Sequence, residues 1–267
     1  MSNAKMIFAY SIGKKLVMAL TGLFLVSFLV IHLLGNLQLF TGNAKAFNDY
    51  TQFMTTSPLI KASEFILLAG FLLHILFAVR LTQLNASARP EKYANHKESA
   101  SSSWASRNMG MTGSVILLFL IMHLVMFWGK FHYASGEMTP AKTALAETWK
   151  VTADVKAKDG AVLVGANQYV TKENIGLLEK EGIVEVPALS MFKITALAFK
   201  EWWIVLLYVA GMALLGFHLN HGFQSAFRTL GLIHKKYTPL IEKAGLAFCI
   251  IIPLLFALIP VYYLVAG

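Results

Sequence analysis

The chain has 267 residues, of which 57% are hydrophobic and 14% are charged, and its formal net charge at pH 7 is +9. These values exclude an ordinary soluble domain, in which charged residues make up about 25% of the chain. A helix that crosses a membrane needs roughly 20 predominantly apolar residues, because it spans a hydrocarbon core of about 30 Å. Since five stretches meet this requirement, we expect an all-α membrane protein with five transmembrane helices.

In chain order, we expect helices at residues of about 14–40, 59–82, 108–130, 202–227 and 239–265. The first apolar stretch is too long for a cleaved signal peptide and has no clear small-residue cleavage site, so we expect a retained span. The fifth contains Pro253 and Pro260. These should kink that helix without ending it, because neighbouring groups can satisfy the carbonyls that proline leaves free. The whole chain, 1–267, is therefore predicted to be one membrane domain with an insertion at 131–200.

Basic residues gather on one side of this predicted topology. They lie before the first helix and in the connections between helices two and three and between helices four and five: Lys5, Lys14, Lys15, Arg80, Arg89, Lys92, Lys97, Arg107, Arg228, Lys235, Lys236 and Lys243. The positive-inside rule therefore predicts a cytoplasmic N-terminus, an outside C-terminus and an extracytoplasmic segment 131–200. The basic connections are also suited to docking cytoplasmic subunits. Nucleic acid is not an expected partner for a face held against a membrane.

The segment 131–200 shows no catalytic constellation. Its residues 161–170 have some strand character. Thr171 is expected to cap a short helix that runs through Glu181 and is ended by Gly182.

Cys249 is the only cysteine and lies in the apolar fifth stretch. The chain therefore has no intramolecular disulfide and no Cys-x-x-Cys-His motif for covalent attachment of a c-type haem. Any haem must be held by ligation and packing alone.

Five histidines lie within the expected spans, and each of the first four helices contains at least one: His32, His74, His123, and His218 with His221. His32 and His123 come well after the basic residues that precede their helices, which places them near the outer leaflet. His74 and His218 come shortly before the basic residues that follow their helices, which places them towards the cytoplasm. The rise of about 1.5 Å per residue separates these two layers by roughly 10–15 Å.

Two layers of paired histidines favour two b-type haems, because a haem iron takes two axial ligands and bundles build such sites from facing helices. A lone histidine in a span is more often a helix-to-helix hydrogen-bonding group. A proton relay or metal transporter usually includes buried carboxylates, and the inner parts of the expected spans carry none. His221, one turn after His218, is a weaker candidate for the same ligand position.

Four segments resemble the cytochrome b558 family, the single-chain, di-haem membrane subunits of succinate:quinone oxidoreductases. They are SIGKKLVMALTG at 11–22, HLLGN at 32–36, FNDY at 47–50 and FHLNHGFQS at 217–225. The resemblance implies that the first four helices form a haem-binding bundle. It implies His32 and His123 as axial ligands of a distal haem b, and His74 and His218 as those of a proximal haem b. The long segment 131–200 departs from the family, in which this connection is shorter.

The resemblance also implies partners and a location. These are a flavoprotein subunit and an iron–sulfur subunit on the cytoplasmic face, a membrane quinone of the menaquinone type, and the lipid of a bacterial cytoplasmic membrane. Glu64, at the outer end of helix two, would relay quinone protons, although a carboxylate there is also typical of the membrane interface. Lys14, Arg80 and Arg228 are expected to pair with haem propionates.

Two other functions remain open. The first is a di-haem cytochrome b subunit of another quinone-linked complex, of the nitrate reductase or hydrogenase type. The second is a haem-free transporter or anchor. Because no flavin-binding or dicarboxylate-binding pattern is apparent, we expect a redox subunit of succinate dehydrogenase or fumarate reductase that does not itself bind succinate.

Overall fold

The computed structural model describes residues 11–88 and 104–266, and it is mostly helical (76%). Helices long and apolar enough to cross a membrane occur five times, at Ile12–Thr41, Pro58–Ser87, Met109–Tyr133, Trp202–Thr229 and Thr238–Ala266. This confirms the prediction of an integral membrane protein with five candidate spans. Arg89, Lys92 and Lys97 of the basic connection, and Lys5 before the first span, lie outside the described residues.

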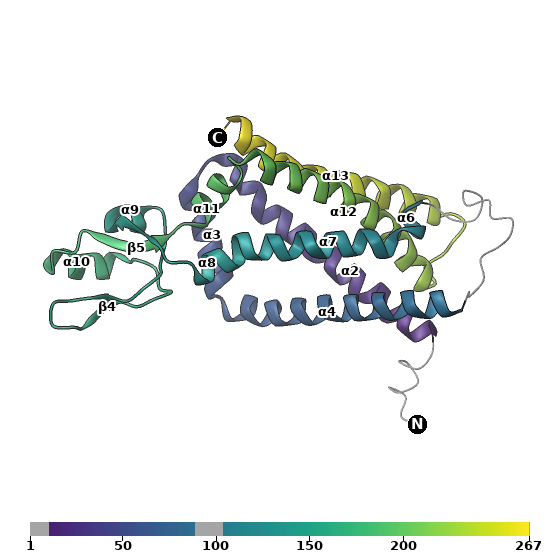
Figure 1. Cartoon of the computed structure of the whole chain (residues 1–267), viewed down its shortest axis with the longest axis horizontal. Helices are drawn as coiled ribbons and strands as arrows, with labels where there is room; N and C mark the ends of the chain where they lie inside the picture. Colours follow the sequence, from purple (N-terminus) through teal and green to yellow (C-terminus); the bar gives the residue numbers. More distant parts are fainter. Residues whose placement is uncertain (1–10, 89–103, 267) are drawn as a thin grey trace, which may run out of the picture. The chain divides into compact units, whose positions relative to one another are not determined.

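The spans are built from long helices, some of which continue into tighter or wider turns (Figure 1). Their elements are α2 (Ser11–Asn36) with the 3₁₀ turn η1 (Leu37–Thr41), α4 (Pro58–Ser87), α7 (Met109–His123) with the π-helical turn η2 (Leu124–Gly129) and α8 (Lys130–Tyr133), α12 (Trp202–Thr229), and α13 (Thr238–Ala266). A short helix, α6 (Trp104–Arg107), precedes α7. Helix α13 continues through Pro253 and Pro260, as expected.

Large apolar side chains cover the outer surface of the spans. Leu34, Phe65 and Leu118 are 62%, 73% and 67% exposed. Contiguous apolar surface of this kind is unfavourable in water and marks a membrane-facing surface. A helix suits that environment because all its backbone hydrogen bonds are internal.

The chain groups into two compact units. Unit 1 comprises Met1–Leu33, Ala62–Leu118 and Val209–Ala257, and unit 2 comprises Leu34–Lys61, Phe119–Tyr208 and Leu258–Gly267. In unit 1, glycines allow close helix packing. A Cβ atom at Gly216 would lie 3.1 Å from the Cys249 carbonyl oxygen, and one at Gly245 would overlap the Phe223 ring. Small residues at helix contacts are typical of membrane bundles.

In unit 2, helix α3 (Ala44–Thr56) packs on α11 (Met191–Ala198). Asn48 of α3 is 2% exposed and fully hydrogen bonded. Its amide nitrogen donates to the Glu147 carbonyl and the Ser190 hydroxyl, each at 2.8 Å, and its Oδ1 accepts from the Phe192 backbone N–H at 3.0 Å. A buried amide with three partners fixes how α3 lies on α11.

Asp49 follows on the same helix and joins α3 to the insertion. It accepts hydrogen bonds from the Lys45 ammonium and the Thr148 hydroxyl. Burial raises the pKa of Asp49, but the two hydrogen bonds and the charge of Lys45 outweigh it and hold the pKa below its usual value.

The insertion 131–200 forms an α/β structure with its own core. One antiparallel sheet has the strand order β1 (Glu137–Pro140), β5 (Glu185–Leu189), β2 (Lys150–Val151). A second antiparallel sheet is formed by β3 (Val155–Lys156) and β4 (Val162–Val164). Helices α9 (Ala141–Ala146) and α10 (Lys172–Lys180) accompany the strands. The core includes Ala144, Val151, Val164, Leu178 and Val186, each 0% exposed.

The sheets correct the expectation of an all-α chain. Short valine-rich runs separated by turns favour strands over helices, and of the strand character expected at 161–170 only Val162–Val164 becomes a strand. The helix expected after Thr171 is confirmed. Thr171 accepts from the Asn174 N–H in a capping box, and Gly182 follows the helix with φ +74°.

Candidate functional site

Two of the predicted histidine ligands contact each other in unit 1. His74 of α4 and His218 of α12 have ring centroids 6.4 Å apart and ring planes at 65°. Two imidazoles that bind one metal ion from opposite sides have centroids roughly 6 Å apart, because each metal–nitrogen bond is about 2 Å long. The distance between the two rings is therefore compatible with both histidines holding one metal ion.

Two glycines from the neighbouring helices lie against these rings. A Cβ atom at Gly22 of α2 would lie 3.4 Å from Cε1 of His74, and one at Gly113 of α7 would lie 3.3 Å from Cε1 of His218. Each imidazole thus packs against backbone where a larger side chain would displace it. The inner pair is therefore surrounded by α2, α4, α7 and α12.

Thr21 of α2 orients the His74 ring. Its hydroxyl donates to the Val17 carbonyl oxygen at 2.8 Å, and its Oγ1 lies 3.2 Å from Nδ1 of His74. The donor and acceptor roles in this contact depend on the tautomer of His74; when Nδ1 carries the ring hydrogen, Oγ1 accepts it. In that tautomer the lone pair is on Nε2, the arrangement in which a histidine binds a metal while its other nitrogen is hydrogen bonded.

His218 has a buried nitrogen without a partner. Its Nδ1 forms no hydrogen bond with any described residue. Buried polar atoms are almost always paired with protein, water or a bound group. The orphaned atom, the ring spacing and the glycines together fit a prosthetic group held at this pair. His218 is also the α12 histidine in ring contact with His74, which favours it over His221 as the partner.

The predicted outer ligands, His32 and His123, belong to different units, so their pairing stays a prediction. In unit 1, the His32 ring stacks on Phe28, with centroids 5.3 Å apart, and packs against Phe256 at 5.6 Å.

In unit 2, His123 lies in an aromatic cluster that includes Phe119, Phe127 and Tyr208. Its Nδ1 is 2.9 Å from the Tyr208 hydroxyl oxygen. The π-helical turn η2 begins directly after His123, and such turns occur frequently at functional sites. Sequence reasoning missed Tyr208 and Thr21. Each of these two residues carries a hydroxyl group within an otherwise apolar helix. That hydroxyl, within reach of a histidine, was the signal that could have identified them.

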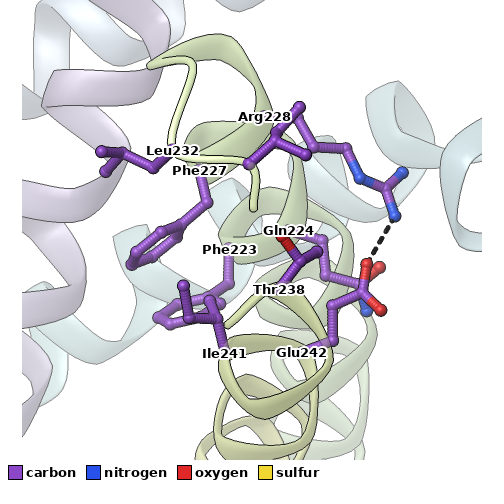
Figure 2. Close-up of a pocket in the computed structure, with 9 residues that line it drawn as sticks. Phe223, Gln224, Phe227, Arg228, Leu232, Thr238, Ile241 and Glu242 are labelled. Atoms are coloured by element: carbon purple, nitrogen blue, oxygen red, sulfur yellow. Dashed lines mark hydrogen bonds and ion pairs between the residues drawn. The ribbon is translucent and has the colours of Figure 1, made fainter. Parts of the chain in front are cut away.

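The basic residues expected near haem propionates have other contacts. Arg228, in the last turn of α12, forms an ion pair with Glu242 of α13 at 2.9 Å (Figure 2). The cavity beside it measures about 10 Å³, which holds no more than about one water. Arg80 is 3.4 Å from Gln83 Oε1, at the limit of a hydrogen bond. Lys14 is half-buried. Pairing of Lys14, Arg80 and Arg228 with propionates stays a prediction.

Glu64 lies in the second turn of α4 and is partly exposed. Its role in quinone proton transfer stays a prediction. Among the residues that the structure describes, no group of three or more His, Cys, Asp or Glu side chains is placed to hold a metal ion. Comparison with family models, curated proteins and solved structures found no match to the chain.

Proposed function

We propose that this chain is the haem-binding, electron-transferring membrane anchor of a succinate:quinone oxidoreductase. The observation that supports this most directly is the contact between His74 and His218, whose rings have the spacing of two ligands to one iron. The partnerless Nδ1 of His218 adds to it, because a buried histidine with an unsatisfied atom is costly unless a bound group completes the site.

In this proposal, His74 and His218 hold a proximal haem b. His32 and His123 hold a distal haem b, from their matched depth in the sequence. When bound, haem supplies a one-electron redox centre to the membrane. Thr21 hydrogen bonds to Nδ1 of His74 and would orient that ring, and Gly22 and Gly113 let the two rings pack closely against α2 and α7.

The partners follow from the same proposal. An iron–sulfur subunit and a flavoprotein dock on the basic cytoplasmic connections, and a membrane quinone of the menaquinone type exchanges electrons with the haems. Glu64 relays protons for that quinone. The chain lies in a bacterial cytoplasmic membrane with its N-terminus inside. Succinate is handled by the flavoprotein, so this chain is the redox subunit of the enzyme.

Haem content tests the proposal. The full-length protein, purified in detergent from haem-sufficient cells, should contain two b haems per chain by pyridine haemochrome and by the reduced-minus-oxidised spectrum. His74→Ala and His218→Ala should each remove one haem. His234→Ala, in the exposed turn after α12, should remove none.

The outcomes separate the proposal from its rivals. A folded preparation without haem would contradict it and favour a transporter or a plain anchor. Two haems together with co-purification of a molybdenum or nickel–iron subunit, in place of a flavoprotein, would assign the chain to a nitrate reductase or hydrogenase.

A further inference from the structure

A polar cavity lies where the third span meets the insertion, entirely within unit 2. It measures about 250 Å³, far above the roughly 15 Å³ needed for one water. Residues from the end of α8 and from the strand region of the insertion line it, among them His132, Ser135, Lys150, Thr152 and Asn167. No acidic side chain belongs to the lining. A polar cavity of this size, with basic residues and without carboxylates, is suited to an anion.

Lys150 is the principal charged group of this cavity. It is only 5% exposed, and its Nζ donates to Asn167 Oδ1 at 3.1 Å and lies 4.7 Å above the Phe131 ring. In the described part of the chain it forms no ion pair. Burial lowers the pKa of Lys150, and the charge of Lys61 lowers it further. Buried ammonium groups are normally paired with an anion, because desolvation of an isolated charge is costly.

The backbone holds this unpaired ammonium in place. Asn167 has φ +68°, a left-handed conformation that asparagine tolerates better than most residues. Its backbone N–H donates to the Val151 carbonyl at 2.8 Å, which fixes the loop beside β2. The side-chain oxygen is thereby held against Nζ. An ammonium has three hydrogens, so Lys150 retains donor capacity beyond the bond to Asn167.

The surroundings place the cavity at the end of a span. His132 stacks on Trp128, with centroids 4.6 Å apart, and its Nδ1 is 2.8 Å from the Trp128 carbonyl oxygen. Trp128 and Tyr133 are 45% and 79% exposed. Exposed tryptophan and tyrosine at the end of a span mark the level of lipid headgroups.

We propose that this cavity binds a phosphate group, with the Lys150 ammonium as its charge partner. A phosphate oxygen takes the remaining donor capacity of Nζ and neutralises a charge that the protein leaves unpaired. Both the headgroup of an anionic phospholipid and free phosphate present this chemistry. The inference is independent of haem, because the contacts that support it involve none of His32, His74, His123 and His218.

The test uses the full-length protein, delipidated in a neutral detergent. Thermal unfolding and native mass spectrometry are recorded with inorganic phosphate, phosphatidylglycerol or phosphate-free diacylglycerol at matched ionic strength. We expect saturable binding of one phosphate-bearing molecule per chain, weakened about tenfold or more by Lys150→Met. Lys142→Met should leave it unchanged, because Lys142 is exposed and pairs with Glu179.

Asn167→Asp gives a second test that keeps Lys150. The new carboxylate would neutralise the ammonium within the protein, so binding should also be lost. Binding of phosphatidylglycerol alone would identify a lipid headgroup, and binding of inorganic phosphate would identify a free anion. An equal response to diacylglycerol, no saturable response, or full binding by both variants would overturn the proposal.

Discussion

Replacement of Thr21 by valine tests the proposed haem site at a single hydrogen bond. Valine keeps the shape of threonine but removes the oxygen that lies 3.2 Å from Nδ1 of His74. A hydrogen bond at Nδ1 makes the imidazole a more basic ligand, and a more basic ligand favours the oxidised iron with its higher charge. Loss of the bond should therefore raise the midpoint potential of the proximal haem.

The size of the shift follows from the strength of the bond. A neutral hydrogen bond contributes about 1 kcal/mol. A tenfold change in equilibrium constant corresponds to about 1.4 kcal/mol and, for one electron, about 59 mV. Complete loss of the bond in the oxidised state alone would therefore raise the potential by about 40 mV, and we expect about 20–40 mV.

A spectroscopic redox titration of the purified protein measures this shift. Thr21→Val should raise the midpoint potential of one of the two redox components. The haem content should stay near two per chain. Thr21→Ser should restore the wild-type value. Thr82→Val is the matched control, because the Thr82 hydroxyl also donates to a backbone carbonyl, that of Ala78. Equal titrations of Thr21→Val and wild type, both with haem bound, would refute the assigned role of Thr21.

Three further predictions concern packing and charge. Gly113→Leu should reduce haem content from two towards one per chain, because the new side chain would displace the His218 ring. Asn48→Ala should lower the free energy of unfolding by about 3 kcal/mol, since three hydrogen bonds of about 1 kcal/mol each are lost; denaturant unfolding measures this. The folded-state pKa of Asp49 is lowered, so its carboxylate should stabilise the fold at pH values above the usual pKa of about 4. This stabilisation should be lost as the pH falls through the folded-state pKa. Thermal unfolding against pH measures this contribution.

Each of these predictions has an internal control. Gly110→Leu should retain both haems, because the nearest atom to a Cβ at this position is 4.0 Å away, on Thr82. Asn48→Asp should destabilise nearly as much as Asn48→Ala, since a carboxylate oxygen would face the Glu147 carbonyl. Asp49→Asn should reduce the loss of thermal stability that occurs as the pH falls. An unchanged loss in that variant would assign the pH dependence to other carboxylates.

The five spans were predictable because lipid imposes one rule on every segment that crosses it. Backbone groups must be satisfied internally, so a long apolar run becomes a helix. Hydropathy does not mark helix ends, however. Helix α4 continues beyond the apolar stretch to Ser87, through a segment in which the good helix formers are Arg80, Leu81, Gln83, Leu84 and Ala86. The π-helical turn after His123 has no sequence signal that we recognised.

The insertion could be predicted only where its signals were local. The capping box at Thr171 depends on only four consecutive residues, and the structure contains it. The sheet depends on pairing between distant residues, such as Met138 with Pro187, and its strands are too short for alternation to be read. The Lys150 cavity was missed for the same reason, because its lining comes from residues that only the sheet and its loops bring together.

The contact between His74 and His218 could be anticipated only in part, because depth along a helix follows from sequence position but contact does not. Matched depth indicated His74 and His218 as a pair, and the structure places their rings in contact. Depth could not identify Thr21 as a partner of His74, because that identification requires knowing which face of α2 packs against α4. Glycines at 22 and 113 were visible in the sequence, but their contacts with the two rings were not.

If a haem binds at His74 and His218 as proposed, it should contribute to the stability of unit 1. Helices in lipid gain little from hydrophobic burial, so polar groups and close packing contribute much of their association. Here those groups are two histidines, of which one has an orphaned nitrogen. A ligand that binds this site more tightly in the folded arrangement than in the unfolded chain stabilises the fold by mass action. The insertion has its own apolar core, so its folding does not require that ligand, and the two should respond differently to haem depletion.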